Sequence, residues 1–387
     1  MVAPYRPMFL AGAIWAMVGV VLAGWDTRVD LTLSPFGDRW AWHGHEMVFG
    51  FAAAMFAGYV LTAMPSWTER ARMSRPDVAL LLALWFVARL TAMGAFGTNP
   101  VVVIAGSAAF LGFVALTLAR GALRSPSVKS TGLALFALAM TGVQIAVLFE
   151  GTARFIPAMG FAILLSLLGG RMVAAFTWNR LSHTAPFERR FKAARRSGYV
   201  SVLAMMVALL LESFGTASDW LFASLLVAAV AELGRLSLWV SRDSFRDGLL
   251  GMLSLAYAWL PLGLLLVAFS KSSDWILPES DAWHALTTGA LACSFYAVAS
   301  RAVARRDRHL RPALADLIGF VLLWITAAWR VFFPVESIGY ATVSLIWCIV
   351  WVIFFVRHGL ALFRPVSRPA FSGPKQRTSR ETTGDSP

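Results

Sequence analysis

The sequence has little charge for its length. Of its 387 residues only 14% are charged and 58% are hydrophobic, whereas an ordinary soluble domain is about 25% charged and about 45–50% apolar. The composition therefore excludes an ordinary soluble domain and indicates a polytopic membrane protein.

Cysteine is almost absent as well. The two cysteines, Cys293 and Cys348, each lie inside an apolar run with no second cysteine nearby. A disulfide framework or a thiolate metal cluster needs several cysteines at characteristic spacings. The sequence supports neither, and both cysteines are interpreted as small apolar residues of the spans.

Acidic residues are scarcer than basic ones, which gives a formal net charge of +13. In a soluble chain this charge would suggest a nucleic-acid partner. Here the basic residues lie in short gaps between apolar runs, where they report membrane topology. We therefore expect the lipid bilayer, and no nucleic acid, as the surrounding partner of the chain.

What the sequence does contain is about twelve apolar runs, each long enough to cross a bilayer as a helix. No alternating strand pattern recurs, and runs of this length satisfy their backbone groups as helices. The sequence predicts an all-α, polytopic helical membrane protein. Its spans are expected at 8–25, 43–66, 77–96, 100–120, 130–149, 155–178, 198–215, 219–240, 248–270, 282–303, 313–333 and 338–362.

The loops between the runs differ in charge. Gaps after even-numbered runs are rich in basic residues, such as Arg70, Arg120 and Arg189, while gaps after odd-numbered runs hold acidic residues such as Asp26 and Asp219. Because basic loops stay in the cytoplasm, both termini are expected there.

The predicted organisation is one integral-membrane bundle over 1–364. A long basic loop near 180–197 divides it into two halves of about six spans each, and no sequence repeat between these halves is evident. Residues 365–387 are rich in Pro, Ser, Thr and Arg, and are expected to form a disordered cytoplasmic tail.

Three histidines are predicted at the outer mouth of the bundle. His43 and His45 begin the second span in "WHGHEM", and His284 begins the tenth. On a regular helix His43 and His45 point about 200° apart, so they cannot ligate one metal from the same face. Paired imidazoles commonly hold haem iron, and imidazole also suits copper. Which of the two pairs with His284 stays open.

The face below His43 is unusually bare. His43 shares it with Glu46 and then with Gly50, Ala54 and Gly58, because steps of three and four residues stay on one side of a helix. Such a face lets a flat cofactor approach the backbone closely. The alternative is a packing seam of small residues with histidines at the membrane interface.

Other polar residues lie inside the predicted spans, where they are costly unless paired. Arg89 and Glu212 lie in the third and seventh spans, and Glu232 with Arg235 suggests a structural ion pair. Arg171 follows two glycines and could bind a carboxylate such as a haem propionate. Its predicted depth near the cytoplasmic side argues against reaching the outer site, and snorkelling to the interface is the alternative.

Four stretches resemble the NnrS family of membrane proteins. The most specific is "WHGHEMVFGFAAAMFAGYVLTAMPSWT", which is similar to the family's W-H-A-H-E-M start and its L-L-T-A-x-P-N-W-T end. The others are "YRPMFLAGAIWA", "GGRMVAAFTWN" and "HALTTGALACSFYAVASRA". The resemblance touches most of the chain.

The resemblance implies a twelve-span bacterial inner-membrane protein that contains haem and copper. It also implies a link to denitrification and to tolerance of nitric oxide. Carried over by position, the family's paired histidines and following glutamate fall on His43, His45 and Glu46, and its later histidine on His284; these four are the candidate metal ligands. Its arginine and asparagine fall on Arg171 and Asn179.

The chain departs from the family pattern in places. Ala174 stands where the family usually has proline, and Ser66 where it has asparagine. After the tenth span "RRDRHLRP" replaces the family's G-H-T-G-R, so Arg306 or a displaced His309 occupies that neighbourhood. If that histidine is a ligand in the family, this chain lacks one metal site.

The sequence leaves three functions to consider. The first is a haem- or copper-dependent protein that turns over, senses or sequesters nitric oxide. The second is a secondary transporter of a small solute, since about twelve spans in two halves also describe many carriers. The third, a haem-copper oxidase, ranks low because its adjacent histidine pair and its histidine-proline-glutamate motif are absent from the sequence.

Overall fold

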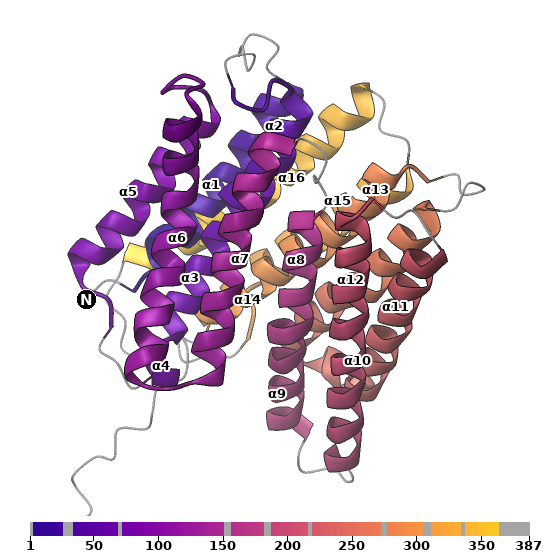
Figure 1. The fold of residues 1–387 in the computed structure, drawn as a ribbon. Coiled ribbons are helices and arrows are strands. Elements are labelled where there is room, and N and C mark those ends of the chain that lie inside the picture. Colours follow the sequence, from indigo (N-terminus) through magenta and orange to yellow (C-terminus); the bar gives the residue numbers. More distant parts are fainter. Residues whose placement is uncertain are drawn as a thin grey trace, which may run out of the picture.

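The computed structural model is a bundle of long helices that run roughly along one direction (Figure 1). Every regular element among the described residues is a helix, which confirms the all-α prediction. The structure describes residues 3–25, 34–68, 72–150, 156–181, 187–215, 219–271, 277–304, 311–333 and 337–363.

The helices form two groups that lie side by side (Figure 1). The first group holds α1 (Tyr5–Gly24), α2 (Arg39–His45), η1 (Glu46–Ala52), α3 (Ala53–Ala63), α4 (Pro65–Thr68), α5 (Arg75–Ala92), α6 (Pro100–Arg124), α7 (Val128–Glu150) and α16 (Ser337–Phe363). The second group holds α8 (Ile156–Leu164), η2 (Leu165–Gly169), α9 (Gly170–Leu181), α10 (Phe187–Ser213), α11 (Asp219–Trp239), η3 (Arg242–Arg246), α12 (Gly248–Ser270), α13 (Glu279–His284), η4 (Ala285–Ala292), α14 (Cys293–Ala304) and α15 (Leu314–Phe332).

Ten helices in the described part of the chain are long and apolar enough to cross a membrane. The two other predicted spans coincide with α5 and with the continuous run α13–η4–α14. They are less apolar because α5 carries Arg75, Asp77 and Arg89, and η4 and α14 carry several hydroxyl side chains. The polytopic membrane fold is thus confirmed.

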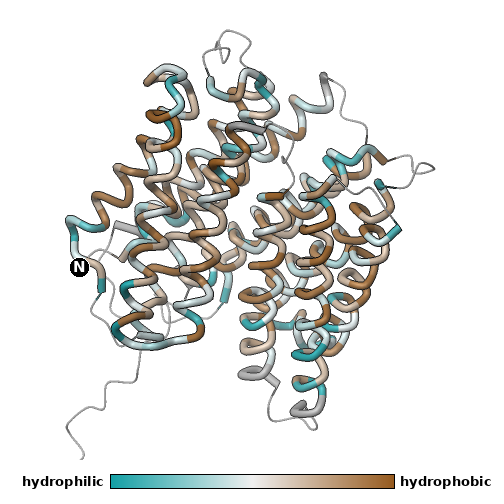
Figure 2. Tube along the Cα trace, viewed as in Figure 1, coloured by the Kyte–Doolittle hydropathy of each residue, from teal (hydrophilic) through white to brown (hydrophobic). Residues whose placement is uncertain are grey.

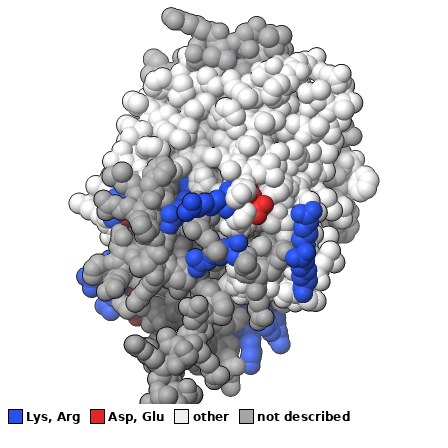
Figure 3. All heavy atoms as spheres, turned by 90° about the vertical axis from the view of Figure 1, so that its left-hand side faces the viewer, with Lys and Arg blue, Asp and Glu red and all other residues white. Residues whose placement is uncertain are grey.

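The outer surface of the bundle suits a bilayer. Large apolar side chains such as Leu135, Leu203 and Val230 are 61%, 68% and 61% exposed. Hydrophobic residues are distributed along nearly every helix (Figure 2). An exposed apolar surface of this extent marks contact with lipid or protein. In Figure 3 the Lys and Arg side chains gather on the lower part of one face, away from the end that carries α2 and α13. We call the α2 and α13 end the histidine end.

The predicted division near 180–197 stays a prediction. By packing, α8 and α9 lie beside α10 and α12, and α16 returns to pack on α1. The predicted tail 365–387 lies outside the described residues, as do His183 and His309.

Three spans are interrupted by π-helical turns, namely η1, η2 and η4. A π turn leaves backbone carbonyls poorly paired, and in lipid they need another donor. Trp85 Nε1 donates to the Gly50 carbonyl in η1 at 2.9 Å. Arg235 donates to the Ser166 carbonyl in η2 at 2.8 Å. Side chains from neighbouring helices therefore hold two of these interruptions in place.

The structure also contains an internal repeat, and its two copies do not coincide with the two predicted halves of the chain. In residues 5–124 (the first repeat), α1 packs on η1 and α3, and α5 packs on α6. In residues 248–363 (the second repeat), α12 packs on η4 and α14, and α15 packs on α16. Both repeats start on odd-numbered spans, so they run in the same direction through the membrane.

The sequence supports this repeat once the helices are matched. Ala-Trp-His stands at 41–43 and again at 282–284, directly before or near a π turn. Asp77 caps the start of α5 and Asp316 caps the start of α15. Each precedes a tryptophan by the same spacing, Trp85 and Trp324. His43 and His284 are therefore equivalent residues of the two repeats.

Candidate functional site

The structure brings His43 and His284 together at the histidine end. His43 lies on α2 and His284 ends α13, and both are half-buried. His284 interacts electrostatically with His43 and with Arg330, and His43 also interacts with Arg330. His43, and not His45, is the neighbour of His284.

Backbone carbonyls orient both imidazoles. His43 Nδ1 lies 3.2 Å from the Gly19 carbonyl of α1, and His284 Nδ1 lies 2.6 Å from the Ser280 carbonyl of α13. A carbonyl can only accept, so each Nδ1 carries the proton and each Nε2 keeps its lone pair. Neither Nε2 has a partner among the residues that the structure describes. Metal-ligating histidines are commonly held in this way.

His45 belongs to a different cluster. It is buried between the rings of Phe36 and Phe49, at centroid distances of 4.3 and 4.9 Å. Its Nδ1 lies 2.8 Å from Glu46 Oε1, and its Nε2 lies 3.2 Å from Gln144 Nε2 on α7. Both nitrogens of His45 are thus occupied by protein groups.

Glu46 joins His45 to Arg89. Arg89 on α5 donates to Glu46 Oε2 at 2.8 Å, and the side chains are 1% and 0% exposed. Helical spacing placed Glu46 on the face of His43, but its carboxylate turns to His45 and Arg89. Both of its oxygens are therefore engaged by the protein.

Arg330 and Asp281 lie beside the histidine pair, and sequence reasoning did not select them. Arg330 on α15 donates to Asp281 Oδ1 at 2.6 Å, with the side chains 16% and 15% exposed. Two signals could have found them: Asp281 precedes His284 by one helical turn, and Arg330 ends a predicted span. The pair links α13 to α15 next to both imidazoles.

Aromatic side chains and open space complete the surroundings of His43. Trp40 contacts the His43 ring at 6.2 Å and the Tyr340 ring at 5.5 Å, between ring centroids. At Gly44, directly after His43, an added Cβ would meet no other atom. The backbone beside His43 is therefore open to a bound group.

Arg171 lies far from this pair. It follows Ile156, which is at the histidine end, by fifteen residues of one span, or about 22 Å at 1.5 Å per residue. Its side chain is exposed, and its charge acts on Tyr59 of α3. Of Asn179 the structure describes the backbone only. The role of Arg171 in cofactor binding stays a prediction.

Glu232 and Arg235 form a buried cluster at another level of the bundle. Glu232 accepts from Tyr257 at 2.6 Å and from Ser166, while Arg235 also contacts Tyr257 at 3.1 Å. Arg235 stacks on Trp239 at 4.7 Å. The expected ion pair is present at 3.5 Å, within a network that braces η2.

Glu212 is paired, although the sequence offered it no local partner. Lys271 Nζ lies 3.0 Å from Glu212 and 2.5 Å from Glu279. Glu279 also accepts from Trp283 Nε1 at 3.1 Å. Burial opposes the charge of Lys271, but the hydrogen bonds that it donates to Glu279 and Glu212 outweigh this effect, and the pKa of Lys271 is raised.

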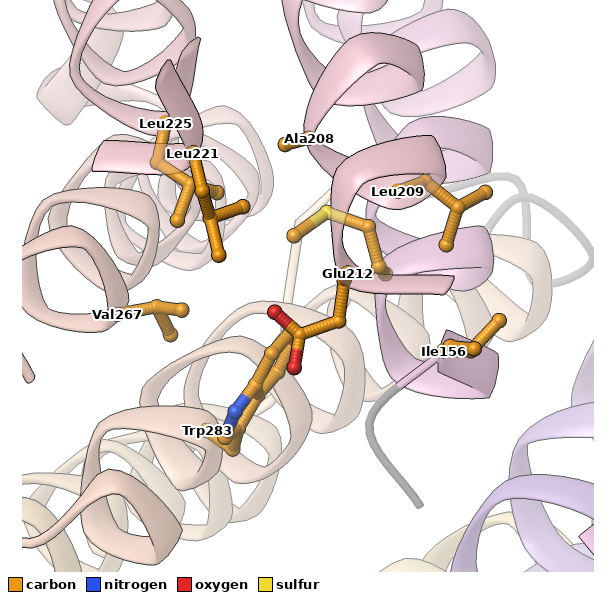
Figure 4. A pocket seen from close by; sticks show the side chains of 9 residues that line it. Ile156, Ala208, Leu209, Glu212, Leu221, Leu225, Val267 and Trp283 are labelled. Carbon is orange, nitrogen blue, oxygen red and sulfur yellow. The ribbon is translucent and has the colours of Figure 1, made fainter. Parts of the chain in front are cut away.

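These side chains border a small apolar pocket. Figure 4 shows the Glu212 carboxylate directed toward the Trp283 indole, with aliphatic side chains around them. The lining comes from Ile156, Met159, Ala208, Leu209, Leu221, Leu225 and Val267. Glu212 is the charged residue of this lining and is neutralised by Lys271, so the pocket suits an apolar occupant.

His358 lies toward the opposite end, on α16. It is fully buried, its Nε2 lies 3.1 Å from Asp316 Oδ1, and its ring packs on Phe354 at 4.6 Å. Within the described residues no three of His, Cys, Asp and Glu gather as a metal-binding group. A two-histidine arrangement, as at His43 and His284, is a different kind of site.

Comparison with known proteins agrees with the sequence resemblance. No curated protein matches the chain at a significant level. The family model described as NnrS protein matches residues 1–365, which include both repeats and both clusters at the histidine end. The chain therefore belongs to the NnrS protein family.

Proposed function

We propose that this protein holds haem iron between His43 and His284 and uses it to bind nitric oxide in the bacterial inner membrane. The observation that carries the proposal is the pair of equivalent imidazoles, each with Nδ1 on a backbone carbonyl and Nε2 without a partner among the described residues. The choice of nitric oxide as the bound gas rests on the family resemblance.

The residues present suit a haem in three respects. The two imidazoles of His43 and His284, from different helices, would hold the iron of such a haem. The space at Gly44 leaves the backbone open to a flat group. Trp40 and Tyr340 supply aromatic walls beside His43. Bound there, haem iron would supply the affinity for nitric oxide, which would take the place of one of the two imidazoles.

The protein's own part is to orient and to shield. Gly19 and Ser280 fix the two imidazole tautomers through their carbonyls. The surrounding apolar helices would concentrate a small apolar gas beside the site. Turnover, sensing and sequestration are all compatible with these roles.

A copper site is less well supported. His45 and Glu46 are the nearest additional candidates, but His45 is held by Glu46 and Gln144, and Glu46 by His45 and Arg89. A copper ion there would have to displace these buried contacts. The described residues therefore do not fit copper at His45.

The experiment is an optical spectrum of the full-length protein purified in detergent, with iron and copper analysis of the same sample. We expect a Soret band, about one iron per chain, and a shift of the band when nitric oxide is added to the reduced protein. A fully folded preparation from haem-replete cells without a Soret band would overturn the proposal.

A second candidate, a transporter of a small solute, is favoured by one observation. Transporters often bind substrate at interrupted helices in corresponding positions of two repeats, and η1 and η4 are such a pair. A preparation without haem that still bound a solute at the histidine end would favour this function.

A further inference from the structure

We propose that Arg330 binds a propionate carboxylate of the haem that His43 and His284 hold, with Asp281 as the residue that positions the guanidinium. This inference rests on the proposed haem site. It places the propionate edge of the haem on the side of the histidine pair that α13 and α15 form.

The first reason is position. Arg330 is the guanidinium that interacts electrostatically with both His43 and His284. Its charge also acts on Tyr340, which stands against Trp40 near His43. A ligand that spans the two imidazoles therefore lies within reach of this cation.

The second reason is spare hydrogen-bonding capacity. A guanidinium has five N–H donors in a rigid fork, which matches a carboxylate in two-pronged geometry. Arg330 uses Nη1 toward Asp281 at 2.6 Å. Within the described residues its other donors have no protein acceptor, so a second carboxylate can bind.

The third reason is the role of Asp281. It lies one turn before His284 on α13, so its bond to Arg330 fixes the guanidinium relative to that imidazole. The arrangement couples the position of the cation to the position of one proposed iron ligand. Asp281 is thus a positioning residue.

The fourth reason is the contrast with Arg89, its nearest counterpart in the first repeat. Arg89 is 1% exposed and enclosed with Glu46, whereas Arg330 is 16% exposed at the mouth. A ligand carboxylate can therefore approach Arg330 but not Arg89. Arg171, about fifteen residues down its span, lies at another level.

The test compares haem with haem dimethyl ester, whose carboxylates are blocked. Full-length protein produced without haem is titrated with each compound in detergent, and binding is followed by the Soret band. We expect the wild type to bind haem about tenfold or more tighter than the ester, because a charge-assisted pair is lost.

The variant Arg330→Gln should abolish this preference by weakening haem alone, and Arg330→Lys should keep part of it. Asp281→Asn should reduce the preference while the ester binds as before. Arg246→Gln is the matched control, because Arg246 is paired with Asp243 and 81% exposed. It should keep the full preference.

The outcomes separate the two proposals. Equal affinity of the wild type for haem and for the ester would overturn the role of Arg330 while leaving the haem site in place. An unchanged preference in Arg330→Gln, or in Arg330→Met if the first variant does not fold, would do the same. Failure of the wild type to bind either compound would overturn the proposed function itself.

Discussion

The two repeats carry the same helix order and the same Ala-Trp-His, yet they differ in how they use charge. In the first repeat the ion pair Glu46–Arg89 is sealed, with side chains 0% and 1% exposed. In the second repeat the ion pair Asp281–Arg330 stands at the mouth, 15% and 16% exposed. The histidine stands at the equivalent position in both repeats. Each ion pair, in contrast, occurs in one repeat only.

The sealed pair is expected to hold the fold, and the open pair to serve a ligand. A buried pair is strongly destabilised when one partner is lost, because the other charge remains without compensation. A pair that keeps some contact with solvent loses less, because the remaining charge stays partly hydrated. The comparison therefore predicts larger effects on stability in the first repeat than in the second.

The largest effect is expected for Arg89→Met, which leaves the Glu46 carboxylate buried beside His45. We expect a loss of about 3–5 kcal/mol in the free energy of unfolding, measured by thermal or denaturant unfolding in detergent. Arg330→Met should cost less, because its partner Asp281 keeps part of its surface in contact with solvent. A larger loss in Arg330→Met than in Arg89→Met would break the comparison.

The next largest effects are expected at Gly50 and Gly289, which lie within the π-helical turns η1 and η4. A Cβ at Gly50 would lie 2.5 Å from Arg89 Nη1 and from Trp15, and one at Gly289 would lie 2.6 Å from the Trp259 ring. Each Gly→Ala change should cost about 1–3 kcal/mol through overpacking. The control is Gly142→Ala, where an added Cβ meets nothing. If Gly50→Ala unfolds like Gly142→Ala, the packing around η1 is looser than described.

A smaller effect is expected for Trp85→Phe. It removes the Nε1 donor that the Gly50 carbonyl in η1 accepts at 2.9 Å. A buried carbonyl left without a donor costs about 1–3 kcal/mol, part of which water can recover. Hydrogen exchange in residues 46–52 should accelerate. Unchanged exchange there would contradict the role of Trp85 in holding the π turn.

The smallest effect concerns Lys271, whose pKa is raised by Glu279 and Glu212 against the opposing effect of burial. A lysine with a raised pKa contributes stability below its unfolded pKa of about 10.4, and this is lost as pH rises through the folded pKa. The melting temperature of Lys271→Met should therefore lie slightly below the wild type at pH 8, with the gap closing as the pH rises past the unfolded pKa and through the raised folded pKa. A gap that widens with pH would contradict this pairing.

Much of the fold could be predicted from the sequence, because apolar length and the absence of strand patterning decide it. Helical geometry also separated His43 from His45 correctly. It could not show that Glu46 turns to His45, because Arg89, which donates to Glu46, comes from α5 and Gln144, which holds His45, comes from α7. A helical wheel represents one helix and therefore carries no information about side chains from neighbouring helices.

The same limit explains why Arg330 and Asp281 were missed. Each lies near the end of a predicted span, where charged residues are ordinary. Their meaning depends on α13 and α15 packing together, which no local pattern states. The repeat was also hidden, because its two copies are separated by α7 to α11 and share few identical residues.

The most direct test of the histidine pair is the Soret absorbance per folded chain of three variants purified alike. His43→Ala and His284→Ala should lose haem, because each removes one proposed ligand. His45→Gln should retain it, because His45 is enclosed by Glu46 and Gln144. Loss of haem in His45→Gln with retention in His43→Ala, at equal folding, would contradict the account.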